Sequence, residues 1–83
     1  MHEYPQRLVS IKVREKLPFD QVPSLCATIT ACEKELAESG RVVVRYSGTE
    51  PKIRILVEAS ESKLVDFWIA KLSQVVMDNL CDD

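Results

Sequence analysis

The hydrophobic side chains of this chain follow two different spacings, and the order of these spacings restricts the folds it can adopt. In residues 8–14 and 52–58 apolar side chains alternate along one face, which is typical of a strand with one buried side. In residues 23–38, and from residue 61 to about residue 80, apolar side chains recur at helical spacing. Residues 41–46 are rich in valine, which favours another strand. The predicted order is therefore β-α-β-β-α.

Proline, glycine and capping residues indicate where these elements begin and end. Pro23 suits the first position of a helix because its missing N–H group costs nothing there. Gly40 stands where the first helix is expected to end in the left-handed conformation. Ser60 is a suitable N-cap for the second helix, with Glu61 in the first turn. Each helix must bury one apolar stripe, so we expect an α+β fold with both helices on one face of a mainly antiparallel sheet of three or four strands.

Length and charge exclude several classes of protein. A chain of 83 residues has room for one domain, so residues 1–83 are expected to fold as a single unit. Eleven Lys and Arg against thirteen Asp and Glu give a net charge of −2, which does not favour a nucleic-acid partner. No apolar stretch approaches the roughly 20 residues of a membrane span, and no signal-peptide pattern opens the sequence. We expect neither a nucleic-acid nor a membrane partner.

The residues that usually carry out catalysis or bind metals are sparse. The three cysteines, Cys26, Cys32 and Cys81, form no CxxC pair and are expected to be free thiols in a reducing cytoplasm. The only histidine is His2, at the terminus, so no Ser–His–acid set and no metal-ligand spacing occurs. Ser47 lacks a base that would make it a nucleophile. We therefore assign no catalytic and no metal-binding residue.

The hairpin predicted between residues 41 and 58 has the properties of an anion site. Residues 41–54 carry four Arg or Lys side chains against Glu50, although the whole chain is acidic. Arg45 precedes the loop and Arg54 follows it, and a guanidinium matches phosphate oxygens two at a time.

The loop itself, Ser-Gly-Thr-Glu-Pro at 47–51, adds neutral donors. Ser47 and Thr49 carry hydroxyl groups, and Gly48 allows a ligand to approach the backbone closely. Successive N–H groups in such a turn can form an anion-binding concavity. The segment predicts a phosphate site.

Other interpretations of the same residues remain open at this point. The arginines could pair with Glu50 and Glu58, and a one-residue slip in the pairing would move Arg45 to the other face of the sheet. Tyr46 could stack on a sugar ring or, as we prefer, pack on the sheet. A small α+β module that docks a protein or RNA through an open sheet face is the alternative function. Its weakness is that Tyr46 is the only aromatic residue in the predicted strands.

The segment Arg-Tyr-Ser-Gly-Thr-Glu-Pro-Lys-Ile-Arg at 45–54 resembles the phosphate-binding loop of the α-D-phosphohexomutase family, found in the last of its four domains. Eight positions of the pattern R-x-S-G-T-E-P-x-I-R agree. The strand at 8–14, the connector at 16–19 and a helix ending at Gly40 follow the order of that domain, so the resemblance covers nearly all of the chain. It implies an arrangement similar to that of the TATA-box-binding protein. Glycine at position 48 is similar to the phosphoglucosamine mutase branch, whereas phosphomannomutases and phosphoglucomutases often carry Asn there.

The resemblance also implies a division of roles. The substrate phosphate would be held by Arg45, Ser47, Gly48 and Thr49, with Glu50 and Arg54 bracing the loop and direct contact by Arg54 left open. The complete enzyme would interconvert glucosamine 6-phosphate and glucosamine 1-phosphate in the cytoplasm, using a phosphoserine and Mg²⁺. The family's phosphoserine, metal and sugar-recognition loops lie in its first three domains and match no segment here. We therefore expect a domain that binds a hexosamine or hexose phosphate, meets the missing N-terminal domains, holds no cofactor and catalyses nothing alone.

Overall fold

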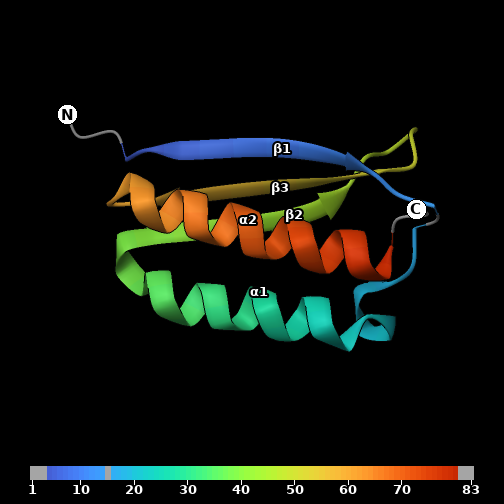
Figure 1. Cartoon of the computed structure of the whole chain (residues 1–83), viewed down its shortest axis with the longest axis horizontal. Coiled ribbons are helices and arrows are strands. Elements are labelled where there is room, and N and C mark those ends of the chain that lie inside the picture. The colour runs from blue at the N-terminus through green and yellow to red at the C-terminus, as the bar shows by residue number, and fades with distance from the viewer. Residues whose placement is uncertain (1–3, 15, 81–83) are drawn as a thin grey trace.

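The secondary structure follows the predicted order of elements. In the computed structural model, residues 4–14 and 16–80 are described, so the predictions for His2 and Cys81 lie outside the described residues. The elements, in chain order, are β1 (Gln6–Lys12), η1 (Phe19–Gln21), α1 (Pro23–Leu36), η2 (Ala37–Ser39), β2 (Gly40–Tyr46), β3 (Lys52–Ala59) and α2 (Ser62–Asn79) (Figure 1). No described helix is both long and apolar enough to cross a membrane.

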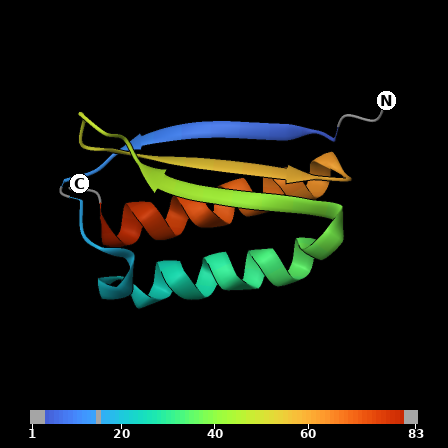
Figure 2. The same ribbon diagram turned by 180° about the vertical axis from the view of Figure 1, so that it is seen from behind.

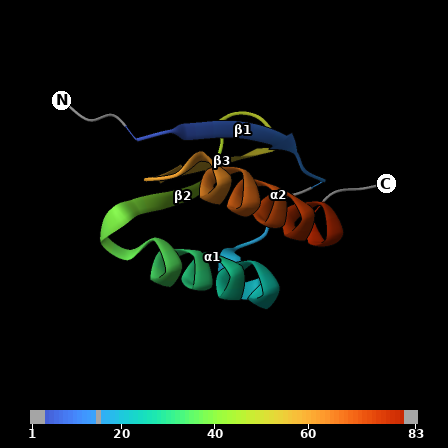
Figure 3. The same ribbon diagram turned by 60° about the vertical axis from the view of Figure 1, so that its left-hand side comes forward.

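The three strands form one antiparallel sheet in the order β1-β3-β2. Both helices lie on the same side of this sheet, as Figures 1 and 2 show from opposite directions. α2 packs across β1 and β3, and α1 runs beside α2 and covers β2 (Figure 3). The α+β architecture with both helices on one face of the sheet is confirmed, and the described sheet has three strands.

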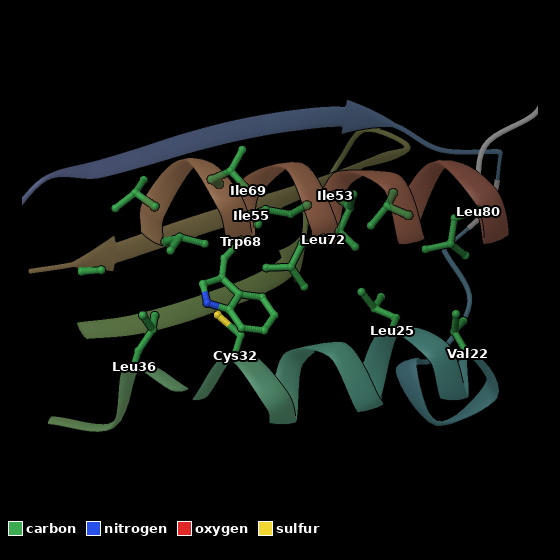
Figure 4. Packing of buried hydrophobic residues seen from close by; sticks show 14 of the residues in the cluster. Val22, Leu25, Cys32, Leu36, Ile53, Ile55, Trp68, Ile69, Leu72 and Leu80 are labelled. Atoms are coloured by element: carbon green, nitrogen blue, oxygen red, sulfur yellow. The ribbon is translucent and has the colours of Figure 1, made fainter. Parts of the chain in front are cut away.

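The core lies between the sheet and the helices. Alternate residues of β3, namely Ile53, Ile55, Val57 and Ala59, are completely buried, and the residues between them face away from the helices. They meet the apolar stripes of the two helices, among them Leu25, Cys32, Leu36, Trp68, Ile69, Leu72 and Val76 (Figure 4). The period-two and helical spacings therefore identified the buried faces correctly.

The end of α1 differs from the prediction. The helix ends at Leu36, and the residue that adopts a positive φ is Ala37, at 43°, not Gly40. Gly40 has extended backbone and begins β2. A Cβ at Gly40 would lie 2.1 Å from the carbonyl oxygen of Glu58, so glycine is needed here because β2 and β3 approach closely. The expectation of a left-handed Gly40 is wrong because the chain turns three residues earlier.

The start of α2 also differs. The helix begins at Ser62, Glu61 is its N-cap residue, and no side chain caps it. The predicted Ser60 cap is wrong because β3 continues to Ala59, whose N–H group donates to the carbonyl of Pro5. Ser60 and Glu61 are then both needed to turn the chain from strand to helix.

Candidate anion-binding site

The strand pairing places the two candidate arginines next to each other. Arg45 of β2 and Arg54 of β3 are direct cross-strand partners, and both are exposed. Their neighbours Ile53 and Ile55 are buried against the helices, so both arginines belong to the face that the helices leave open. Directly opposed residues have Cβ atoms about 4.5–5.5 Å apart. The two arginine side chains therefore begin close together on the open face of the sheet, within reach of a shared ligand.

Neither arginine is neutralised within the part of the chain that the structure describes. Glu50 pairs with Lys52, and Glu58 pairs with Arg41, each at 3.1 Å. No described carboxylate forms an ion pair with Arg45 or Arg54, so the alternative that Glu50 and Glu58 neutralise them is wrong. Like charges directly opposite each other in a sheet are unfavourable. An anion bound between them would relieve this repulsion.

The β2–β3 loop (residues 47–51) presents donors that the fold does not use. The Ser47 N–H group donates to the Lys52 carbonyl, and the Lys52 N–H group donates to the Glu50 carbonyl, each at 2.8 Å. The N–H groups of Gly48, Thr49 and Glu50 have no acceptor among the described residues, and neither do the Ser47 and Thr49 hydroxyls. Consecutive unpaired N–H groups beside a cationic pair are suited to binding the oxygens of an anion.

Gly48 has no structural reason within the chain to be glycine. Its φ lies outside the left-handed region, and a Cβ added there would meet no atom within 4 Å. This differs from Gly40, where close strand packing excludes a side chain. The lack of a side chain at Gly48 leaves the backbone of this loop open to close approach by a ligand.

The connector (residues 16–19) holds the base of the loop from the side of the helices. The Tyr46 hydroxyl donates to the Leu17 carbonyl at 2.5 Å, and its ring lies 5.2 Å from that of Phe19. Burial raises the pKa of Tyr46. As we expected, Tyr46 therefore packs against the sheet and the connector on the helix side, and its ring does not face the open side.

Lys16 makes the second hydrogen bond between the connector and this hairpin. Its Nζ atom donates to the Ser47 carbonyl at 2.5 Å. Sequence reasoning missed Lys16 and Leu17 because their partners are 31 and 29 residues away, and no local pattern marks such contacts.

The described residues offer binding groups but no metal site. No three His, Cys, Asp or Glu side chains in residues 4–14 and 16–80 are grouped so that they could hold a metal ion. The arrangement can hold and orient an anion through charge and hydrogen bonding.

The structure is thus a small α+β domain with an exposed arginine pair beside a loop of free donors, a combination suited to binding an anion. Residues 8–74 match the family model described as "Phosphoglucomutase/phosphomannomutase, C-terminal domain". The chain belongs to this family.

Named relatives narrow the comparison. The chain is 46% identical over 77 residues to the phosphoglucosamine mutase of Anaeromyxobacter dehalogenans. The matched region covers 88% of this chain and 17% of the relative. It is 45% identical over 76 residues to the phosphoglucosamine mutase of Macrococcus caseolyticus, with 92% and 17% covered. The chain thus spans about a sixth of the length of these relatives.

Solved structures share the fold. N-acetylphosphoglucosamine mutase of Aspergillus fumigatus, in complex with glucose 1,6-bisphosphate, gives a TM-score of 0.73 at 27% identity over 95% of this chain and 16% of that one. The structure of the same enzyme in complex with GlcNAc-6P and magnesium gives a TM-score of 0.69 at 28% identity. This match covers 90% of the present chain and 16% of the fungal one.

Proposed function

We propose that this chain is the phosphate-binding domain of a phosphoglucosamine mutase and that it holds the phosphate of a hexosamine phosphate that is not being transferred. The observation that carries the proposal concerns the open face, where Arg45 and Arg54 lie side by side and form no ion pair with a described residue. Beside them, the N–H groups of Gly48, Thr49 and Glu50 and the hydroxyls of Ser47 and Thr49 have no acceptor among the described residues. The names of the bacterial relatives, and the sugar phosphates named for the fungal structures, support the same assignment.

Each residue of the site has a distinct role in this proposal. Arg45 and Arg54 supply charge-assisted hydrogen bonds to phosphate oxygens. Ser47 and Thr49 donate from their hydroxyls, and the backbone at Gly48 approaches the ligand without a side chain in between. Glu50 pairs with Lys52 at the end of the loop and braces it.

The geometry suits a reaction in which the substrate must be presented in two orientations. The site offers donors for a phosphate and no described group that is specific for one sugar. Such a site can hold either end of a sugar bisphosphate while the other end reacts. Holding the substrate in place lowers the barrier, since less entropy is lost at the reacting step.

The remaining parts of the reaction are assigned outside this domain. The complete enzyme would interconvert glucosamine 6-phosphate and glucosamine 1-phosphate. Mg²⁺ would support phosphoryl transfer in that enzyme. The described residues do not fit such an ion, so no step of our proposal passes through it here. We place the protein in the cytoplasm, where the free thiols of Cys26 and Cys32 stay reduced.

Two alternatives can be separated from this proposal. A phosphomannomutase or phosphoglucomutase parent would share the family model and the phosphate contacts. An RNA-binding module needs bases stacked on the open face, yet Tyr46 lies on the helix side, and the central row of that face is aliphatic: Leu8, Val43 and Leu56. The structure therefore gives RNA no aromatic platform on the described strands.

A titration of the chain with glucosamine 6-phosphate, followed by amide NMR shifts, tests the proposal. Shifts should concentrate at residues 45–54. Arg45→Met should weaken binding at least about tenfold because it removes a charge-assisted contact. Arg41→Met is the matched control: it removes the same charge from the same strand and face, but at the Glu58 pair. Equal losses in the two variants, or shifts spread evenly over the surface, would contradict the proposal.

A further inference from the structure

One peptide unit of the β2–β3 loop lies between the connector (residues 16–19) and the proposed phosphate site. The carbonyl of Ser47 and the N–H group of Gly48 belong to the same planar unit, and the described chain contains no cis peptide bond. In a trans unit the carbonyl and the N–H group point in opposite directions. Whatever fixes the direction of the Ser47 carbonyl therefore also fixes the direction of the Gly48 N–H group.

The Ser47 carbonyl is fixed by a single side chain. Lys16 donates to it from the connector at 2.5 Å, and no other described donor bonds this oxygen. Ser47 is also held on its other side, because its own N–H group donates to the Lys52 carbonyl. With the carbonyl directed at Lys16, the Gly48 N–H group points away from the connector.

Rotation of this peptide unit would be easy without Lys16. Gly48 has no side chain to restrict it, and no atom lies near its Cβ position. A rotated unit would turn the N–H group toward the connector and leave a carbonyl oxygen where the donor had been. That oxygen carries partial negative charge and would repel a phosphate.

We infer that Lys16 is a positioning residue of the phosphate site: its hydrogen bond to the Ser47 carbonyl keeps the Gly48 N–H group available to the ligand. The inference rests on the proposed function of the loop. Lys16 acts through the peptide unit and does not contact the phosphate. It thereby contributes to affinity from a segment about 30 residues away in the sequence.

Three variants test this role. Lys16→Met removes the donor, Lys16→Arg retains one, and Lys34→Met removes the same charge from an exposed position on α1. Each is titrated with inorganic phosphate and with glucosamine 6-phosphate, and the Gly48 amide resonance is recorded before ligand is added. If the rotated unit comes to occupy two thirds to nine tenths of the molecules, the apparent Kd rises about three- to tenfold.

The expected result is weaker binding and a displaced or broadened Gly48 resonance in Lys16→Met, recovery of both in Lys16→Arg, and a change below about twofold in Lys34→Met. Wild-type affinity with an unmoved Gly48 resonance in Lys16→Met would overturn the inference. So would weaker binding with an unmoved resonance, since Lys16 would then contact phosphate directly.

Failure of the proposed function gives a different result. In that case the wild-type chain shows no phosphate shifts at residues 45–54. The Gly48 resonance of the ligand-free variants still decides whether Lys16 orients the peptide unit, because it is measured without phosphate.

Discussion

Replacing Gly48 by alanine should make the protein more stable and a poorer phosphate binder at the same time. The added methyl group meets no protein atom within 4 Å, and the backbone does not lie in the left-handed region. The folded state therefore gains no steric conflict. The unfolded chain loses conformational freedom, which in compatible positions stabilises a protein by about 0.4–1 kcal/mol.

The expected magnitudes can be measured with two simple assays. For a domain of this size, 1 kcal/mol shifts Tm by about 4–8 °C, so Gly48→Ala should melt about 2–8 °C above the wild type. Phosphate binding, followed by amide shifts, should weaken about tenfold or more, equivalent to about 1.4 kcal/mol, because the methyl group separates the ligand from the loop amides.

The other glycine of the chain provides the matched control. A Cβ at Gly40 would lie 2.1 Å from the Glu58 carbonyl oxygen, and relieving this overlap should cost about 1–3 kcal/mol of stability. The two Gly→Ala variants should therefore shift Tm in opposite directions. Full phosphate affinity in a folded Gly48→Ala variant would refute the argument that the ligand approaches the backbone there. A large loss of stability would show that the loop conformation itself needs glycine.

Two further predictions concern stability. Burial, with a smaller effect of the Glu33 charge, raises the pKa of the Cys32 thiol from 9.0 to about 11. As the pH rises through this interval, the thiol loses its proton in the unfolded chain but keeps it in the folded chain. In urea titrations, the free energy of unfolding should therefore fall over this pH window by up to about 1.4 kcal/mol per pH unit. Cys32→Ala should remove this contribution to the pH dependence of stability. The same pH dependence in the wild type and in Cys32→Ala would contradict the prediction. Ala37→Gly should stabilise the chain by roughly 1 kcal/mol in thermal melts, because Ala37 has a φ of 43° that costs a residue with a side chain about 1–3 kcal/mol. A lower Tm in this variant would show that the turn is not strained.

The elements and their buried faces could be predicted because they depend on local spacing. Alternation in β3 identified Ile53, Ile55 and Val57 as core residues, and helical spacing identified the stripe of α2. The register between β2 and β3 could not be predicted. Three consecutive valines in β2 favour neither face, and the pairing, including the close approach of Gly40 to β3, is a property of the folded chain.

The geometry of the candidate site could be predicted only in part, for a related reason. The residues 45–54 lie together in the sequence, so their donors could be recognised as a group. Whether Arg45 and Arg54 share a face, and whether Glu50 and Glu58 neutralise them, depends on the register and on competing partners such as Lys52 and Arg41. The bracing by Lys16 and Leu17 depends on tertiary contacts and left no trace in the local pattern.

The position of all proposed ligand groups on one hairpin has an evolutionary consequence. The β2–β3 loop and its two flanking strand ends form a unit of ten consecutive residues, whereas the helices contribute apolar side chains to the core. Substitutions that preserve the apolar stripes of α1 and α2 can therefore accumulate without altering recognition. Exchange of a single short gene segment between related proteins would transfer the recognition element nearly intact, provided that the recipient supplies a connector able to hold the base of the loop.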